Sequence, residues 1–311
     1  MTWCAEFPPS AALGQHLLTK LLRSAVWLLS RAGLRPGVSV QAQRRLLWWG
    51  TRLGRAAGQV RVEASALGCV PCEWLEPREK SGWVVLYLHG GAFIAGSPQT
   101  HRSLTTHLAR VLGARVCALD YRLAPEHSFP AARDDVLVAY RTLLEQGQAP
   151  ERLVIAGDSA GGNLTLVSAL RLRDLGLPLP AALVCFSPFT DLGGDNLHLP
   201  PAGDPLLQPP WLRQGAQAYC PPGADWCLPE LSPHYADLRA LPPLLVQVGE
   251  DELLLRQSEQ LAEQARAVGV DCRLELYRRQ WHVFQLNCGW LASADLALQQ
   301  VHAFLRQRGC P

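Results

Sequence analysis

Short apolar runs alternate along this chain with longer segments in which apolar residues recur every three or four positions. The runs predict six buried strands, at Trp83–Leu88, Ala114–Leu119, Leu153–Ala156, Ala182–Phe186, Leu244–Val248 and Cys272–Tyr277. The longer periodic segments predict five helices, at Ser103–Leu112, Ala131–Gln146, Asn163–Leu175, Arg256–Val268 and Ala292–Arg308. Buried strands separated by helices indicate an α/β fold with a mostly parallel sheet covered on both faces.

The first 58 residues have a different pattern. Leucines at three- and four-residue steps predict a helix from about residue 10, and the Arg35-Pro36-Gly37 turn ends it. A second helical piece follows over Gln41–Ala57. From Gln59 the apolar period becomes two, which predicts an antiparallel hairpin and brings the expected sheet to eight strands. Residues 1–58 are therefore interpreted as the helical part of a cap, and 59–311 as the catalytic domain.

The pattern fails a second time between Thr190 and Pro243. This stretch is rich in proline and includes the aromatic residues Trp211 and Tyr219. A long irregular insertion between two strands is more often a functional loop or lid than a disordered segment. We expect a cap insertion at about 191–240.

Composition narrows the class of protein. Among 311 residues, 48% are hydrophobic and 18% charged, which is typical of a compact globular chain. The net charge of +2, with both signs spread along the chain, gives no reason to expect a nucleic-acid partner. No apolar run is long enough for an integral membrane segment, and the N-terminus lacks the pattern of a secretory signal. The ten cysteines include one CxxC without a second pair, so we expect neither a disulfide framework nor a metal, and a cytoplasmic location.

The motif Gly157-Asp158-Ser159-Ala160-Gly161 lies between a predicted strand and a predicted helix. This is the context of a nucleophile elbow, in which a sharp turn lifts a serine hydroxyl off the sheet edge. Small neighbours are required because the backbone at such a turn is strained. Ser159 is the predicted nucleophile, and the backbone N–H of Ala160 is a predicted oxyanion donor.

Three further loops follow predicted strands. His89-Gly90-Gly91 follows the first parallel strand, and the amides of Gly90 and Gly91 are expected to join Ala160 in the oxyanion hole, with His89 supporting the loop. Asp251 and His282 follow the last two strands. The order Ser159, Asp251, His282 is the one expected of an α/β-hydrolase triad, and the carboxyl ends of parallel strands are where such sheets bind ligands.

Taken together, these motifs resemble the hormone-sensitive-lipase family of carboxylesterases, the bacterial family IV esterases. The resemblance covers roughly residues 60 to 310 and rests on His89-Gly90-Gly91, Tyr121–His127, Phe129-Pro130-Ala131, Gly157–Gly161, Asp251-Glu252-Leu253 and His282-Val283-Phe284. It implies an α/β-hydrolase core with a cap from both irregular regions, hydrolysis of short- to medium-chain acyl esters, no cofactor or metal, and a homodimer. It also places the catalytic acid at Asp251 rather than at the flanking glutamates.

One position departs from the family pattern. Ala92 stands where a third glycine is usual, and a positive φ there would strain an alanine. The candidates for substrate contacts are Phe93, Asp158, Trp211 and Tyr219.

Three alternatives stay open. The same triad serves amidases and carbamate hydrolases. Ligand-binding receptors, such as those for gibberellin, share this fold but have lost the catalytic histidine, which here is present as His282. The N-terminal helices are either a lid, which we favour, a packed appendage, or an anchor that brings a lipase to a membrane surface.

Overall fold

A computed structural model describes residues 4–52 and 54–310. The described chain folds around one sheet of nine strands in the order β1-β9-β8-β7-β6-β4-β5-β3-β2. All neighbouring strands run parallel except β2 with β3 and β3 with β5, which are antiparallel. The strands are β1 (Cys4–Phe7), β2 (Val60–Leu67), β3 (Val70–Pro77), β4 (Val84–Leu88), β5 (Arg115–Leu119), β6 (Leu153–Asp158), β7 (Ala182–Phe186), β8 (Leu244–Gly249) and β9 (Cys272–Tyr277).

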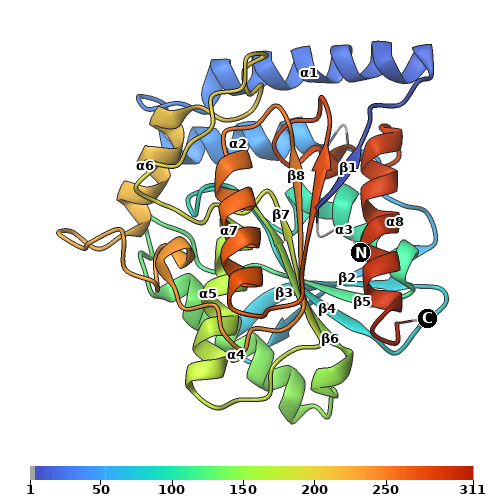
Figure 1. Cartoon of the computed structure of the whole chain (residues 1–311), viewed down its shortest axis with the longest axis vertical. Helices are drawn as coiled ribbons and strands as arrows, with labels where there is room; N and C mark the ends of the chain where they lie inside the picture. The colour runs from blue at the N-terminus through green and yellow to red at the C-terminus, as the bar shows by residue number, and fades with distance from the viewer. Residues whose placement is uncertain (1–3, 53, 311) are drawn as a thin grey trace.

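Helices cover both faces of the sheet (Figure 1). Apolar side chains of α3 and α8 pack in one buried cluster, and those of α4, α5 and α7 in the other. Alternate residues of the central strands divide between the clusters: Leu86 faces one and Tyr87 the other. The bounds are α3 (Arg102–Leu112), α4 (Ala131–Glu145), α5 (Ala160–Asp174), α7 (Leu255–Ala267) and α8 (Ala292–Arg306). The predicted parallel sheet with helices on both faces is confirmed.

The sheet has one strand more than the sequence predicted. Residues 4–7, expected to belong to a helical region, form β1 and pair in parallel with β9 at the sheet edge. Four residues are too short for an alternating pattern to be recognised. The assignment of residues 1–58 to the helical part of a cap is therefore wrong for residues 4–7.

Three helices lie at the carboxyl-end side of the sheet. α1 (Leu13–Gly33) crosses the top of the molecule in Figure 1, with α2 (Val40–Thr51) below it and α6 (Pro209–Tyr219) to the left. α2 ends six residues earlier than predicted. Short 3₁₀ helices occur at Gln99–His101, Pro150–Arg152, Pro233–Tyr235 and Phe284–Asn287. Among residues 4–52 and 54–310, no helix is both long and apolar enough to cross a bilayer.

Candidate active site

Four loops converge where the central parallel strands end. β4 leads into His89-Gly90-Gly91, β6 into Ser159, β8 into the acidic loop at 250–252, and β9 into the loop that carries His282. These strands are neighbours in the sheet, except that β7 separates β6 from β8; Ser187 directly follows β7. The sheet therefore brings together loops that are nearly 200 residues apart.

Ser159 sits on the sharp turn that the motif predicts. Its backbone has φ 54° and ψ −116°, a conformation that costs free energy outside glycine. Its N–H donates to the Phe186 carbonyl at 2.9 Å, and its own carbonyl accepts from Phe189 N–H at 3.0 Å. These backbone hydrogen bonds stabilise the strained conformation. A Cβ at Gly157 would overlap the Gly161 carbonyl, and one at Gly161 would overlap that of Leu88. The elbow tolerates only glycine at these two positions.

The glycine loop after β4 has the strained backbone expected of an oxyanion loop. Gly91 has φ 125°, and Ala92 and Phe93 also have positive φ, at 52° and 64°. The concern about Ala92 is therefore borne out: a left-handed backbone costs a residue with a Cβ about 1 kcal/mol. The loop is closed by Ile94 and Ala95, whose N–H groups donate to the Gly91 carbonyl.

Within the described chain, the backbone N–H groups of Gly90, Gly91 and Ala160 donate no hydrogen bond that would occupy them. Gly90 and Gly91 line the same cavity as Ser159, and Ala160 is the next residue along the chain. Free amides beside a serine hydroxyl are suited to binding an oxyanion. The assignment of the three as donors stays a prediction.

His89 holds the loop, as expected. Its Nδ1 lies 2.9 Å from the Gly90 carbonyl oxygen, its ring stacks on Tyr121 at 4.3 Å, and its carbonyl accepts from the Tyr121 hydroxyl. Burial, with the nearby charge of His101, lowers the pKa of His89 to about 3. His89 is therefore neutral at pH 7 and fixed in place.

His282 pairs with Glu252. Its Nδ1 lies 3.3 Å from Glu252 Oε1, and both side chains are buried. The other carboxylate oxygen accepts hydrogen bonds from Ser187 Oγ and Gly249 N–H, each at 2.8 Å. Burial opposes charge on the imidazole, but the hydrogen bond and charge of Glu252 outweigh it and raise the pKa of His282. Glu252 thus orients the imidazole and stabilises its charged form.

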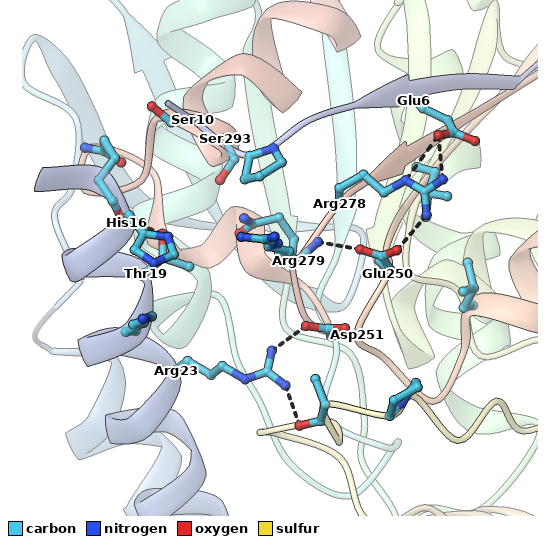
Figure 2. Close-up of a pocket in the computed structure, with 18 of the residues that line it drawn as sticks. Glu6, Ser10, His16, Thr19, Arg23, Glu250, Asp251, Arg278, Arg279 and Ser293 are labelled. Carbon is cyan, nitrogen blue, oxygen red and sulfur yellow. Dashed lines mark hydrogen bonds and ion pairs between the residues drawn. The ribbon is translucent and has the colours of Figure 1, made fainter. Parts of the chain in front are cut away.

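The expectation that Asp251 contacts the histidine is wrong for this structure. Its Oδ2 lies 2.9 Å from Arg23 Nη1 of α1, while Glu250 binds Arg278 at 2.6 Å (Figure 2). Consecutive side chains at the strand end point different ways, and it is Glu252 that points towards His282. The hydrophobic run Leu253–Leu255 directly after Glu252 was the available signal, because it marks where the loop turns into the core.

Asp158 is buried beneath the oxyanion loop. Its carboxylate accepts from the Tyr87 hydroxyl at 2.6 Å and lies 3.3 Å from His101 Nε2. Burial alone would raise its pKa, but the charge and hydrogen bond of His101 lower it below the ordinary value. Asp158 forms part of the cavity wall, but its carboxylate is already bound by Tyr87 and His101. These contacts indicate that Asp158 supports the oxyanion loop.

A cavity of about 60 Å³ joins the functional residues. Ser159 and His282 line it, together with apolar side chains from the N-terminal helices and from the insertion after β7, namely Leu34, Leu47, Leu206, Leu207 and Trp211. Of the four predicted substrate contacts, Asp158 and Trp211 therefore lie at the cavity. Phe93 and Tyr219 do not; their rings stack on each other at 3.9 Å and brace α6 against the oxyanion loop.

Known proteins share both the fold and the sequence of this chain. A family model described as alpha/beta hydrolase fold matches residues 85–286. The crystal structure of an esterase from the bacterial hormone-sensitive lipase family superposes with a TM-score of 0.87, at 36% identity over 96% of this chain and 99% of that one. The chain belongs to the hormone-sensitive lipase family.

Curated relatives of this hormone-sensitive-lipase-family chain are similar over most of their length. An acetyl-hydrolase of Streptomyces hygroscopicus is 42% identical over 77% of this chain and 81% of its own. An esterase of Acinetobacter venetianus is 35% identical over 93% of this chain and 95% of its own. The resemblance stated from the motifs is confirmed, and it extends into the N-terminal helices.

Besides Glu252, the sequence prediction missed a second buried acid near His282. Asp204, in the insertion after β7, accepts from the N–H groups of Leu206, Leu207 and Leu253 at 2.8 to 3.0 Å. Burial raises its pKa to about 6, although the charge of His282 opposes this. A lone aspartate in a proline-rich loop gave no signal. Asp204 ties the cavity wall at 206–207 to the residue that follows Glu252.

No group of three or more potential metal ligands gathers in the described chain.

Proposed function

We propose that this protein is a serine carboxylesterase in which Ser159, His282 and Glu252 form the triad. Membership of the hormone-sensitive lipase family and relatives named esterase support ester hydrolysis. The observation that carries the assignment of residues is the buried Glu252–His282 pair, at 3.3 Å, beside a serine on a strained elbow.

The first half of the reaction forms an acyl-enzyme. The free Nε2 of His282 takes the Ser159 proton as the hydroxyl oxygen attacks the ester carbonyl carbon. The developing oxyanion is bound by the amides of Gly90, Gly91 and Ala160; one such donor is worth on the order of 3 kcal/mol of barrier. Glu252 stabilises the imidazolium without itself being protonated. The C–O bond then breaks, and His282 protonates the departing alkoxide.

The second half releases the acid. Water loses a proton to His282 as its oxygen attacks the acyl carbon, and the oxyanion hole binds the negative charge again. When this intermediate collapses, the Ser159 oxygen leaves with the proton from His282. The triad returns to its starting state.

A small cavity supports a short acyl group. Its volume is about 60 Å³, and the apolar part of its wall consists of five leucine side chains with Trp211 and Val283. A tight apolar pocket binds a short alkyl chain well, whereas each further methylene needs space that the walls would have to provide. The names acetyl-hydrolase and ethyl acetate hydrolase among the relatives agree with this preference.

A panel of nitrophenyl esters from acetate to decanoate, with the matching acetanilide, tests the function. We expect kcat/KM to be highest at the short esters and the anilide to be turned over far more slowly. The Ser159→Ala variant should fold and lose several orders of magnitude in activity. Comparable turnover of anilide and ester would favour the amidase alternative, and an active Ser159→Ala variant would exclude this nucleophile.

We further infer that α1, α2 and the insertion at about 191–240 act together as a cap. Both segments supply walls of the cavity, Leu34 and Leu47 from the first and Leu206, Leu207 and Trp211 from the second. Arg44 of α2 also binds the Ile94 carbonyl beside the oxyanion loop at 2.7 Å. The homodimer implied by the family resemblance is tested by sedimentation velocity, and the cytoplasmic location by fractionation of cells.

A further inference from the structure

The outer surface of α1 is apolar and exposed. Leu13, Leu17, Leu21 and Leu28 fall on one side of the helix and are 73%, 54%, 69% and 62% exposed. Leu18 and Leu22, on the opposite side, pack against the core. A helix that already buries one apolar side has no need of a second for folding. We call the exposed leucines, together with Trp27, the outer face of α1.

The inner side fixes α1 rigidly to the body of the protein. Arg23 binds Asp251 and the carbonyls of Ala202 and Gly203, and Figure 2 shows Arg23, Thr19 and His16 turned towards the loops that follow β8 and β9. Near the other end of the helix, Ser30 Oγ donates to the Pro205 carbonyl at 2.7 Å. The outer face is therefore held in place away from the sheet (Figure 1).

The N-terminal segment that contains α1 and α2 carries an excess of positive charge. Between Glu6 and Glu63 the chain has one lysine and eight arginines and no aspartate or glutamate. The even spread of charge inferred for the whole chain does not hold here, and the remainder has more acidic than basic residues. Arg23 and Arg44 are paired with carboxylates from elsewhere. Lys20 and Arg45 are exposed and have no carboxylate partner in the described chain.

Exposed tryptophans accompany these cations. Trp48 and Trp49 of α2 are exposed, and the Arg52 guanidinium lies 4.6 Å and 5.7 Å from their ring centroids. Arg31 lies 5.9 Å from the Trp27 ring in the same way. Tryptophan is enriched where an apolar ring meets polar headgroups, and arginine can lay its stem on apolar surface while its charge stays at the boundary.

We propose that the outer face of α1, with Trp48 and Trp49 of α2, docks on an anionic phospholipid surface. Leucines and tryptophans enter the headgroup boundary, and unpaired lysine and arginine side chains contact lipid phosphates. A nucleic acid would use the positive charge but leave the leucines without a partner. A second copy of the chain would bury the leucines but bring the two basic segments together.

Sedimentation of the full chain with vesicles tests this proposal. One set of vesicles is pure phosphatidylcholine and the other contains a third phosphatidylglycerol. We expect binding to the anionic vesicles, weaker binding to the neutral ones, and a fall in binding as salt is raised. Binding to neither set would overturn the proposal.

Two double variants separate the apolar and the charged contributions. Leu17→Gln/Leu21→Gln keeps helix propensity and should reduce partition into anionic vesicles at least tenfold. Lys20→Gln/Arg45→Gln should reduce it roughly 25-fold, since one basic side chain near such a surface contributes about fivefold. Leu175→Gln, at an exposed leucine after α5, is the matched control and should bind as the wild type does.

Folding and self-association are measured on the same samples. Thermal unfolding and turnover of a water-soluble nitrophenyl ester should be unchanged in all three variants, so that a loss of vesicle binding cannot come from unfolding. Equal losses in the control and the Leu17→Gln/Leu21→Gln variant would contradict a specific face. A second result would also contradict the proposal: the wild type forms a dimer, the Leu17→Gln/Leu21→Gln variant is a monomer, and neither binds vesicles. The outer face of α1 would then be covered by a second copy of the chain.

Discussion

At the residue scale, three adjacent carboxylates, at Glu250, Asp251 and Glu252, are candidates for the triad acid. Only Glu252 reaches His282, and its second oxygen has two donors that hold it. Glu252→Gln should therefore fold but lower kcat by roughly 10⁴, because a neutral amide no longer holds the catalytic tautomer or stabilises the imidazolium. Steady-state kinetics on nitrophenyl acetate measure this loss.

Asp251→Asn is the matched control for that substitution. It breaks a partly exposed ion pair with Arg23 and leaves Glu252 in place, so its loss should stay below about tenfold. If Asp251→Asn gave the large loss and Glu252→Gln the small one, the triad proposed here would be wrong by one residue.

The pKa of His282 predicts where activity falls on the acid side. Glu252 raises this pKa above the ordinary value of about 6.5 despite burial. Because only neutral imidazole accepts the serine proton, activity is lost as pH falls through the raised pKa. We expect the midpoint of the acid limb of kcat/KM above about pH 6.5.

Removing Glu252 should move this titration. In Glu252→Gln the burial remains but the carboxylate does not, so the pKa of His282 should fall below that of the wild type. An NMR titration of the imidazole resonances measures the shift without needing activity. An unchanged midpoint would show that Glu252 does not set this pKa.

How far the sequence predicts the site depends on which residues are restricted by the backbone. Ser159, Gly157 and Gly161 were predictable because the elbow excludes other side chains. The acid was harder to predict, because Glu252 is held by Ser187 and Gly249, contacts made only in the folded protein, and the leucine run after it is an indirect signal. Asp204 was unpredictable for a similar reason: besides its local contacts to Leu206 and Leu207, it binds the N–H of Leu253, which is 49 residues further along the chain.

At the element scale, α6 is packed tightly against the oxyanion loop. A Cβ at Gly215 would overlap the Ala92 carbonyl oxygen and lie 2.7 Å from Ala92 Cβ. Gly215→Ala should push the helix off the loop, lower the free energy of unfolding by about 1–3 kcal/mol and reduce kcat/KM. Denaturant unfolding and esterase assays measure the two effects.

Gly14 in α1 provides the matched control. It too is helical, but no atom lies within 4 Å of the Cβ that alanine would add. Gly14→Ala should therefore stabilise the protein by up to about 1 kcal/mol through helix propensity alone and leave kcat/KM unchanged. Equal behaviour of the two variants would show that α6 and the loop are not in close contact.

Elements were predicted well where they are long or wholly buried. The six strands expected from apolar runs are present, since burial on both faces forces an apolar sequence, and the hairpin expected from the period-two pattern is present as β2 and β3. β1 escaped prediction because its pairing with β9, rather than its own pattern, makes it a strand. The end of α2 was misplaced because the arginines and alanines over 52–57 favour a helix, so that Gly54 was not taken as its end.

At the scale of the whole molecule, the N-terminal segment does two separate things. β1 covers the edge of β9, and the segment containing α1 and α2 supplies Leu34, Leu47 and Thr51 to the cavity. Deleting residues 1–51 would remove both, so its effect could not be attributed to a lid. Deleting residues 1–9 removes β1 alone and leaves both helices in place.

We expect the two deletions to separate stability from activity. The shorter one exposes a strand edge, so it should lower the melting temperature and promote aggregation while kcat/KM per folded molecule stays near that of the wild type. The longer one should lower the melting temperature further, open the cavity to water and cut kcat/KM on short esters by at least tenfold. Thermal unfolding and the nitrophenyl ester panel, run on both proteins, distinguish these effects. If both deletions gave the same kcat/KM across the panel, the helices would be a packed appendage and not a cap over the active site.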